Sequence, residues 1–163
     1  MPITLTRIDD RLIHGQVVVG WAQSFRAEHI VVINDEITEN DMQKFLFRMA
    51  TPEEIELSIV TIAQAAEMIK GRLFDEKNTI LLLKCPEDVY RLYKTGGKIG
   101  EVNVGGMHFS ENKFQLFDAI FVNEDDVHAF RLLAAEGVVL EVRMVPTDAK
   151  KDIIKAINEK YGE

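Results

Sequence analysis

Apolar residues recur along the chain in two alternating patterns, one typical of buried strands and the other of amphipathic helices. Short β-branched or aliphatic runs predict strands, and they occupy residues 3–8, 29–34, 55–61, 79–84, 101–106 and 119–122. Between them, apolar residues spaced three or four apart predict helices, at residues 16–25, 42–49, 62–73, 86–95, 124–136 and 148–161. Residues 138–145 alternate apolar with partly polar positions, which is the pattern of an edge strand.

The helix expected at residues 42–49 has a start signal, an apolar stripe and a stop signal. Thr38 followed by Asp41 resembles a capping box, with Asp in place of the usual Glu. The stripe consists of Met42, Phe45, Leu46 and Met49. Pro52 stops the helix. We interpret this stripe, like the nearby Trp21, as core packing.

Strands that alternate with helices at this spacing imply βαβ units and a mostly parallel sheet. Because such crossovers are right-handed, they place helices on both faces of the sheet. The predicted fold class is therefore α/β: an open, mostly parallel twisted sheet with helices on both faces, in which an antiparallel edge strand is allowed. The 163 residues suit one domain, residues 1–163. Ligands of such folds bind beyond the carboxyl ends of the strands, where we expect loops 9–15, 34–37, 85–86 and 105–110.

Composition and charge exclude several classes of protein. A hydrophobic content of 47% with 28% charged residues is typical of a globular protein rather than a disordered one. The formal net charge of -8 disfavours nucleic acid and anionic membranes as partners. The single cysteine, Cys85, allows neither an internal disulfide nor a cysteine cluster for zinc, and we expect no metal and no cofactor. The amino terminus lacks a signal-peptide pattern and no apolar run approaches a membrane span, which predicts a cytoplasmic protein.

Candidate chemistry is concentrated in the stretch RIDDRLIHGQVVVGW, which runs from Arg7 to Trp21 between a predicted strand and a predicted helix. His14 lies just before this helix, whose first amide groups have no helical partners and favour an anion. Gly15 lets the backbone approach a ligand closely, and the guanidinium groups of Arg7 and Arg11 suit phosphate oxygens. These residues together predict an oxyanion pocket that contains a histidine.

A neutral histidine ring keeps one nitrogen as a nucleophile, and Asp9 or Asp10 could hold the ring through the other nitrogen. Two other interpretations remain open at this point. In a receiver-like signalling domain the two aspartates would bind magnesium beside a third, phosphorylated aspartate. The strand that should end in that aspartate ends in Lys84, however, and this interpretation leaves His14 without a role. In a noncatalytic binding module, the two arginines would simply hold an anion.

The segment RIDDRLIHGQV closely resembles the phosphorylation-site motif of the IIB components of the bacterial phosphotransferase system, mannose/fructose/sorbose family. The resemblance extends in the same order to VVINDE at 31–36, VNVGGM at 102–107 and LEVRMVPTD at 140–148, and so covers essentially the whole chain. It implies that His14 accepts a phosphoryl group on ring Nδ1 from a phosphohistidine of a separate IIA protein. His14 would then pass the group to a sugar held by the membrane components IIC and IID. The chain would be cytoplasmic and peripherally associated with that permease.

The resemblance also implies roles for residues around the phosphorylated histidine. Arg11 would balance charge on the phosphoryl oxygens, and Arg7 is a weaker candidate for the same task. Asp10 would orient the loop or the ring, while Gly15 and Gln16 would offer amide groups. Such a transfer between histidines needs no metal.

Four further positions complete the candidate site. We expect Gly105 and Gly106 to form a neighbouring loop of the same pocket, with a tight turn after the strand as the alternative. Asp35 follows a strand end and is a candidate to face the pocket, while the sequence leaves open whether His108 reaches it. We interpret Cys85 as structural, although other IIB families use a phosphocysteine. The sequence does not name the sugar, and it leaves a homodimer open.

Overall fold

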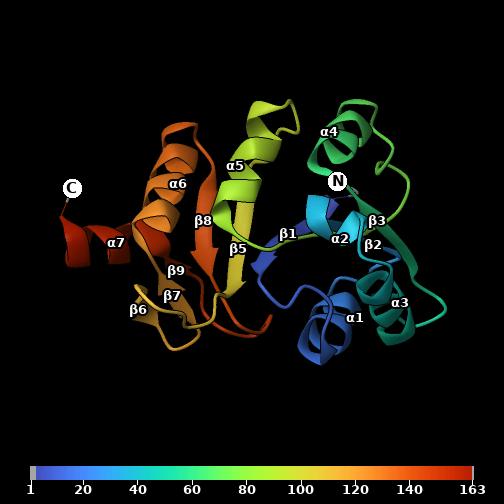
Figure 1. Ribbon diagram of the computed structural model, residues 1–163, viewed down its shortest axis with the longest axis horizontal. Coiled ribbons are helices and arrows are strands. Elements are labelled where there is room, and N and C mark those ends of the chain that lie inside the picture. The colour runs from blue at the N-terminus through green and yellow to red at the C-terminus, as the bar shows by residue number, and fades with distance from the viewer. Residues whose placement is uncertain (1–2, 163) are drawn as a thin grey trace.

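The computed structural model describes residues 3–162, and its centre is a seven-stranded sheet (Figure 1). The strand order is β3-β2-β4-β1-β5-β8-β9. The strands are β1 (Ile3–Asp9), β2 (His29–Ile33), β3 (Glu56–Val60), β4 (Thr79–Leu83), β5 (Glu101–Gly106), β8 (Val139–Val142) and β9 (Lys151–Asp152). Neighbouring strands pair in parallel except β8 and β9, which are antiparallel. The predicted open, mostly parallel sheet is confirmed.

Helices cover the two faces of this sheet unequally. The helical segments are the π-helix η1 (Gln16–Trp21), α1 (Ala22–Ser24), α2 (Asp35–Thr38), α3 (Asp41–Ala50), α4 (Ile62–Lys70), α5 (Pro86–Lys94), α6 (Glu124–Ala135) and α7 (Ile153–Tyr161). Helices α4 to α7 pack on one face around a large apolar cluster that includes Leu83 and Phe130. On the other face, a smaller cluster around Trp21 and Phe47 joins η1, α1 and α3 to strands β1 to β4. Within residues 3–162 this smaller cluster takes no side chain from β5, β8 or β9, so this half of the face is open.

Helix α3 turns its apolar stripe outward, and the core-packing interpretation of that stripe is wrong. The exposed fractions are 67% for Met42, 59% for Phe45, 49% for Leu46 and 72% for Met49. The helix packs instead through Phe47, of which 8% is exposed. Helical spacing shows that a stripe exists, but it does not show which side of the helix meets the sheet. The start signal was also misplaced, because Asn40 caps α3 and Thr38 ends the separate helix α2.

Three other segments differ from the sequence prediction. The segment predicted as an edge strand is β8, which pairs with a strand on each side. The edge strand is β9, whose two residues are too few to show an alternating pattern. The strand predicted at 119–122 is β7 (Ile120–Val122), which forms a separate antiparallel hairpin with β6 (Phe114–Phe117). The last helix begins at Ile153, capped by Asp152, rather than at residue 148.

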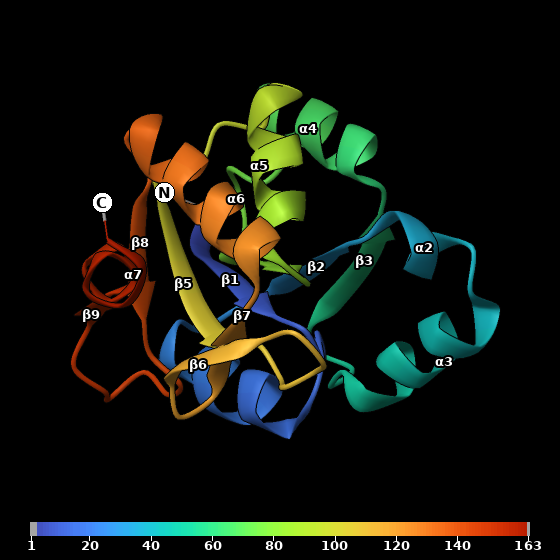
Figure 2. The same cartoon turned by 60° about the vertical axis from the view of Figure 1, so that its left-hand side comes forward.

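Strands β1 and β5 end side by side at the carboxyl edge of the sheet, where Asp9 pairs with Gly106. Figure 2 shows the end of β5 meeting the β6–β7 hairpin, to which it is tied by the hydrogen bond from Met107 N to Ala119 O. The loop between β1 and η1 therefore starts beside this hairpin. None of the helices within residues 3–162 has the length and apolar character needed to cross a membrane.

Candidate functional site

His14 lies in the loop of residues 10–15 between β1 and η1, hereafter the His14 loop. Buried apolar side chains anchor this loop, since Leu12 and Ile13 are only 2% and 6% exposed. Leu12 adopts a positive φ of 59° and donates its N–H to Asp9 O at 2.9 Å, which turns the chain sharply after the strand. The turn leaves the His14 side chain partly accessible, with 16% exposed.

Asp9 is the residue that holds the His14 ring. The distance from His14 Nε2 to Asp9 Oδ2 is 2.7 Å, and the Asp9 side chain is fully buried. Asp9 Oδ1 also accepts the backbone N–H of Arg11 at 3.1 Å. The sequence left the choice between two aspartates open and favoured Asp10, whereas the structure brings Asp9 to the ring.

Opposing effects set the ionisation of Asp9. Burial alone raises the pKa of its carboxyl, but the hydrogen bond and charge of His14, the Arg11 amide and the Arg7 charge together hold that pKa below its ordinary value. Asp9 is therefore ionised at neutral pH and can only accept hydrogen bonds. It follows that His14 Nε2 carries the proton, and that the lone pair of a neutral ring lies on Nδ1.

Arg7 supports Asp9 from beneath and is itself fully buried. Its Nη2 lies 3.2 Å from Asp9 Oδ2, and its Nη1 donates to Asn103 Oδ1 at 2.6 Å. The carbonyl oxygens of Arg143 and Met144 accept further hydrogen bonds from the same guanidinium at 3.1 and 3.3 Å. Burial lowers the pKa of Arg7, while the charges of Asp9 and Glu141 oppose that shift. With these partners the guanidinium holds a carboxylate and is not turned toward an external anion.

The glycine pair at the end of β5 makes room for the side chains of Arg7 and Asp9. Gly105 and Gly106 belong to the extended strand β5 and form neither a loop nor a turn. A Cβ on Gly105 would lie 1.9 Å from Arg7 Cζ, and one on Gly106 would lie 3.1 Å from Asp9 Oδ1. Gly105 is thus required by the close approach of the buried guanidinium.

A buried polar network beyond Arg7 was not found by sequence reasoning. Asn103 Nδ2 donates to Glu141 Oε1 at 3.0 Å, and Arg143 donates to both oxygens of the same carboxylate at 2.9 and 3.0 Å. The ring of Trp21 lies close to two guanidinium groups, with its centroid 4.9 Å from Arg7 Cζ and 5.0 Å from Arg143 Cζ. Trp21 also donates from Nε1 to Met144 O at 3.0 Å. The signal available in the sequence was polar side chains at alternate positions of strands β5 and β8.

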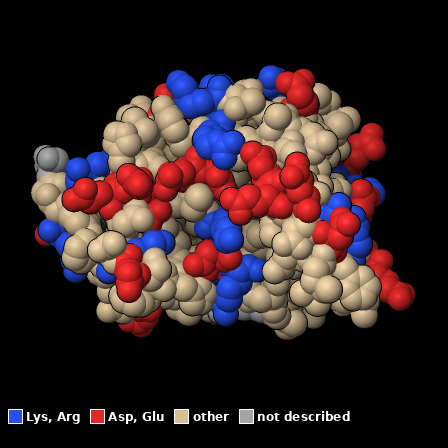
Figure 3. Space-filling model, viewed as in Figure 1, with Lys and Arg blue, Asp and Glu red and all other residues tan. Residues whose placement is uncertain are grey.

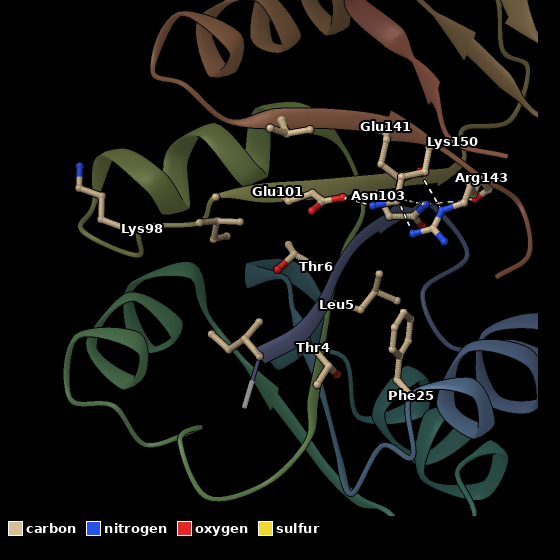
Figure 4. Close-up of a pocket in the computed structure, with 14 residues that line it drawn as sticks. Thr4, Leu5, Thr6, Phe25, Lys98, Glu101, Asn103, Glu141, Arg143 and Lys150 are labelled. Atoms are coloured by element: carbon tan, nitrogen blue, oxygen red, sulfur yellow. Dashed lines mark hydrogen bonds and ion pairs between the residues drawn. The ribbon is translucent and has the colours of Figure 1, made fainter. Parts of the chain in front are cut away.

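Figure 4 shows part of this network at one end of a cavity that has a volume of about 650 Å³. Asn103, Glu141 and Arg143 lie together there, while Lys98 lies at the opposite side of the view; Thr4 and Glu101 also line the cavity. This cavity occupies the open half of the sheet face and is not lined by His14. His14 and Asp9 thus lie at the carboxyl edge of β1, outside this cavity.

The remaining residues of the His14 loop face outward. The Arg11 side chain is 48% exposed, and its Nε lies 3.7 Å from Asp9 Oδ1. Asp10 contacts His108, from whose backbone N–H it accepts at 2.7 Å and whose Nδ1 lies 2.5 Å from its Oδ1. Gly15 is exposed at the start of η1, and Gln16 is the first residue of that helix, with a side chain outside the described part of the structure.

Acidic side chains gather near the same edge. Figure 3 shows them across the middle of one face, over α5 and α6. The first turns of these helices contain Glu87, Asp88, Glu124, Asp125 and Asp126. Burial raises the pKa of Glu87, and the charges of the neighbouring aspartates add to that rise.

Two other candidates lie away from the His14 ring. Asp35 accepts from Ile62 N at 2.9 Å and pairs with Arg91 at 3.0 Å, contacts that lower its pKa and tie α2 to α4 and α5. Burial, followed by the charge of Asp88, raises the pKa of Cys85 to about 12. The thiol is therefore protonated and a poor nucleophile at neutral pH. Among the described residues, no group of three or more His, Cys, Asp or Glu side chains is placed to hold a metal ion.

Comparisons with known proteins identify the family of the chain. A family model described as "PTS system sorbose subfamily IIB component" matches residues 3–163. The sorbose-specific EIIB component of Lacticaseibacillus casei is 36% identical over 163 residues, which is 100% of this chain and 99% of that protein. The mannose-specific EIIAB component of Escherichia coli (strain K12) is 38% identical over 98% of this chain, which corresponds to 49% of that longer protein.

A solved structure extends the agreement to three dimensions. The IIBSor domain of the sorbose permease from Klebsiella pneumoniae matches with a TM-score of 0.91 and 34% identity, over 98% of both chains. These relatives do not favour the receiver-like interpretation or the noncatalytic one. The chain therefore belongs to the sorbose subfamily of IIB components, the phosphotransferases that carry phosphoryl groups in sugar transport by the phosphotransferase system.

Proposed function

We propose that His14 is the phosphoryl carrier of this IIB component, and that Nδ1 of its ring is the accepting atom. The observation that carries this proposal is the 2.7 Å contact between His14 Nε2 and the buried, ionised Asp9. Because Asp9 fixes the proton on Nε2, the ring is held in one orientation with its lone pair on the other nitrogen. Positioning of this kind is the main contribution a protein makes to phosphoryl transfer.

In the first step, the Nδ1 lone pair attacks the phosphorus of a phosphohistidine on a separate IIA protein. The new bond from Nδ1 to phosphorus forms as the bond to the donor ring breaks, and the donor nitrogen keeps the electron pair. The ring of phosphorylated His14 keeps its Nε2 proton and becomes formally positive. The negative charge of Asp9 at 2.7 Å stabilises that ring.

In the second step, a sugar hydroxyl held by the membrane components IIC and IID attacks the phosphorus. The bond between phosphorus and Nδ1 then breaks, and the ring regains its lone pair. The hydroxyl proton passes to a base of the acceptor complex. His14 is thus nucleophile in the first step and leaving group in the second.

Arg11 is the charge partner that we assign to the phosphoryl oxygens, because its side chain is half exposed and stays beside the ring through Asp9. A full charge about 4 Å away contributes about 4 kcal/mol at an effective dielectric of about 20, before desolvation and screening are subtracted. The exposure of Arg11 places its contribution well below that value. The first amides of the helical turn at Gly15 and Gln16 add a smaller attraction. Arg7 acts indirectly, by supporting Asp9.

The partners follow from this assignment. Residues 1–163 form one IIB domain that receives phosphate from a separate IIA protein and works at the cytoplasmic side of a IIC and IID permease. Relatives are named for sorbose, fructose and mannose, and we assign a sugar of this kind as the final acceptor.

The test is phosphorylation by phosphoenolpyruvate through the general phosphotransferase proteins and a mannose-family IIA, for the parent and for His14→Ala. We expect label that is acid-labile and base-stable in the parent and absent from the variant. His128→Ala, which removes an exposed histidine on α6, is the matched control and should label normally. Label retained by His14→Ala, or base-labile label from a small acyl phosphate, would contradict the proposal.

A further inference from the structure

The contact between His108 and Asp10 joins the His14 loop to the chain that follows β5. His108 Nδ1 lies 2.5 Å from Asp10 Oδ1. The backbone N–H of His108 donates to the other oxygen, Asp10 Oδ2, at 2.7 Å. One residue therefore engages both oxygens of a carboxylate and fixes the direction in which its charge points. We call this pair of contacts the clasp.

The clasp rests on a rigid base. Asp10 N donates to Gly106 O at 3.0 Å, so the backbone of Asp10 is fixed to the end of β5. Met107, just before His108, is bonded on both sides to the β6–β7 hairpin, from Met107 N to Ala119 O and from Phe121 N to Met107 O. The Asp10 side chain is 25% exposed and the His108 side chain 55% exposed. The clasp is consequently at the surface, but both of its ends are attached to the sheet.

Contacts other than the clasp also hold the His14 loop in place. The His14 loop is already anchored by buried Leu12 and Ile13 and by the hydrogen bond from Leu12 N to Asp9 O. Exposed histidine–carboxylate contacts of this kind add little to stability. Two directed contacts nevertheless hold the partly exposed carboxylate of Asp10. We relate them to the neighbours of Asp10, which are Asp9 and, through Asp9, the ring of His14.

We propose that His108 is a positioning residue for phosphoryl transfer at His14, acting by holding the Asp10 carboxylate toward the chain after β5 and away from the incoming phosphoryl group. The proposal rests on the proposed function of His14. A phosphoryl group brings close to two negative charges to a loop that already contains Asp9 and Asp10. An Asp10 carboxylate released by His108 is a mobile anion one residue from Asp9, and like charges at this range repel.

The experiment is single-turnover transfer from phosphorylated mannose-family IIA at several IIA concentrations, which separates the maximal rate from the half-saturating concentration. The variants are His108→Ala, His108→Asn and the double variant Asp10→Asn with His108→Ala. In His108→Asn the side-chain amide nitrogen takes the place of Nδ1 and keeps the contact. His128→Ala is the control for loss of an exposed histidine elsewhere.

We expect His108→Ala to lower the maximal rate about tenfold with little change in the half-saturating concentration. His108→Asn should stay within about twofold of the parent, because it restores the contact without the ring. The double variant should recover most of the lost rate, since it leaves no Asp10 charge to be held aside. A merely structural role of the contact predicts no recovery in the double variant, which lacks the contact altogether.

Parent-like transfer by His108→Ala overturns the proposal, and so does equal slowing of His108→Ala and His108→Asn. Absence of label on His14 in the parent is a different result, because it refutes the proposed function. In that case the positioning role falls with it, and amide hydrogen exchange of residues 10–13 still shows whether His108 holds the His14 loop. Faster exchange in His108→Ala than in His128→Ala supports the clasp, and identical exchange refutes it.

Discussion

Gly105 is the position at which one added methyl group tests the support of the His14 site. A Cβ there would lie 1.9 Å from Arg7 Cζ and 2.1 Å from both terminal nitrogens of the guanidinium. Arg7 is fully buried between Asp9 and Asn103, so it cannot move aside without breaking these contacts. Overpacking a core costs about 1–3 kcal/mol, and separating a buried ion pair costs about 3–5 kcal/mol. We therefore expect Gly105→Ala to lower the free energy of unfolding by about 3 kcal/mol or more.

Two other glycines of the site serve as graded controls. A Cβ on Gly106 would lie 3.1 Å from Asp9 Oδ1, which a small shift can relieve, and we expect a loss of about 1 kcal/mol. A Cβ on Gly15 would meet nothing within 4 Å, and its φ of -52° suits any residue. Gly15→Ala should therefore leave the free energy of unfolding within about 0.5 kcal/mol of the parent.

Urea unfolding followed by the fluorescence of Trp21 is the assay, because this ring is buried, lies close to Arg7 and Arg143, and senses their displacement. The linear extrapolation gives the free energy for each variant. A Gly105→Ala protein as stable as Gly15→Ala would refute the close packing of Gly105 on Arg7. Phosphorylation of the stable Gly15→Ala protein then tests separately whether a bare backbone at residue 15 is needed for the approach of the phosphoryl group.

Three further predictions concern ionisation and packing. Burial alone raises the pKa of Asp9, but the hydrogen bond with His14 and the nearby cations hold the pKa in the folded protein below the ordinary value of 3.8. The stability contributed by ionised Asp9 is therefore fully present above pH 3.8. It is lost as the pH falls through the pKa that Asp9 has in the folded protein. The difference in unfolding free energy between the parent and Asp9→Asn should shrink in acid, and a difference independent of pH contradicts this account. Because the pKa of Cys85 is raised to about 12, iodoacetamide should label this thiol slowly until urea unfolds the chain. Rapid labelling of Cys85 in the folded protein would contradict this prediction. On α3, exposed Met49→Gln should change the unfolding free energy by less than about 0.5 kcal/mol, whereas buried Phe47→Ala should lower it by about 3 kcal/mol. A larger loss of stability in Met49→Gln than in Phe47→Ala would restore the core interpretation of the stripe.

The parts of the fold that could be predicted are those set by local patterns. Runs such as HIVVI and TILLL are buried along their whole length in β2 and β4, and a continuous apolar run of that length is typical of a strand covered on both sides. The outward stripe of α3 could not be predicted, because the spacing of Met42 and Met49 is the same whether the stripe meets the sheet or solvent. The π-helix η1 also has no local signal, since its residues suit an ordinary helix equally well.

The choice of Asp9 over Asp10 was within reach of sequence reasoning, because side chains alternate along a strand with a period of two. Leu5, Arg7 and Asp9 lie on one side of β1, whereas Ile8 packs into the core on the opposite face. Had the strand been extended by one residue, Arg7 and Asp9 would have been predicted to share a face. Asp10, the next residue, then falls in the loop, where it meets His108.

The same alternation explains why the support of His14 extends across three strands. Register pairs Arg7 with Asn103, and Asn103 with Glu141, so these side chains form one row across β1, β5 and β8. The row is buried, with exposed fractions of 0% for Arg7, 1% for Asn103 and 4% for Glu141. Hydrogen bonds within the row compensate for much of this burial, as the Asn103 and Glu141 contacts show. A change at Glu141 should therefore reach His14 through Asn103, Arg7 and Asp9. Glu141→Gln keeps the shape of the row but removes a charge, and slower phosphorylation of a stably folded Glu141→Gln protein would show that the row acts as a unit.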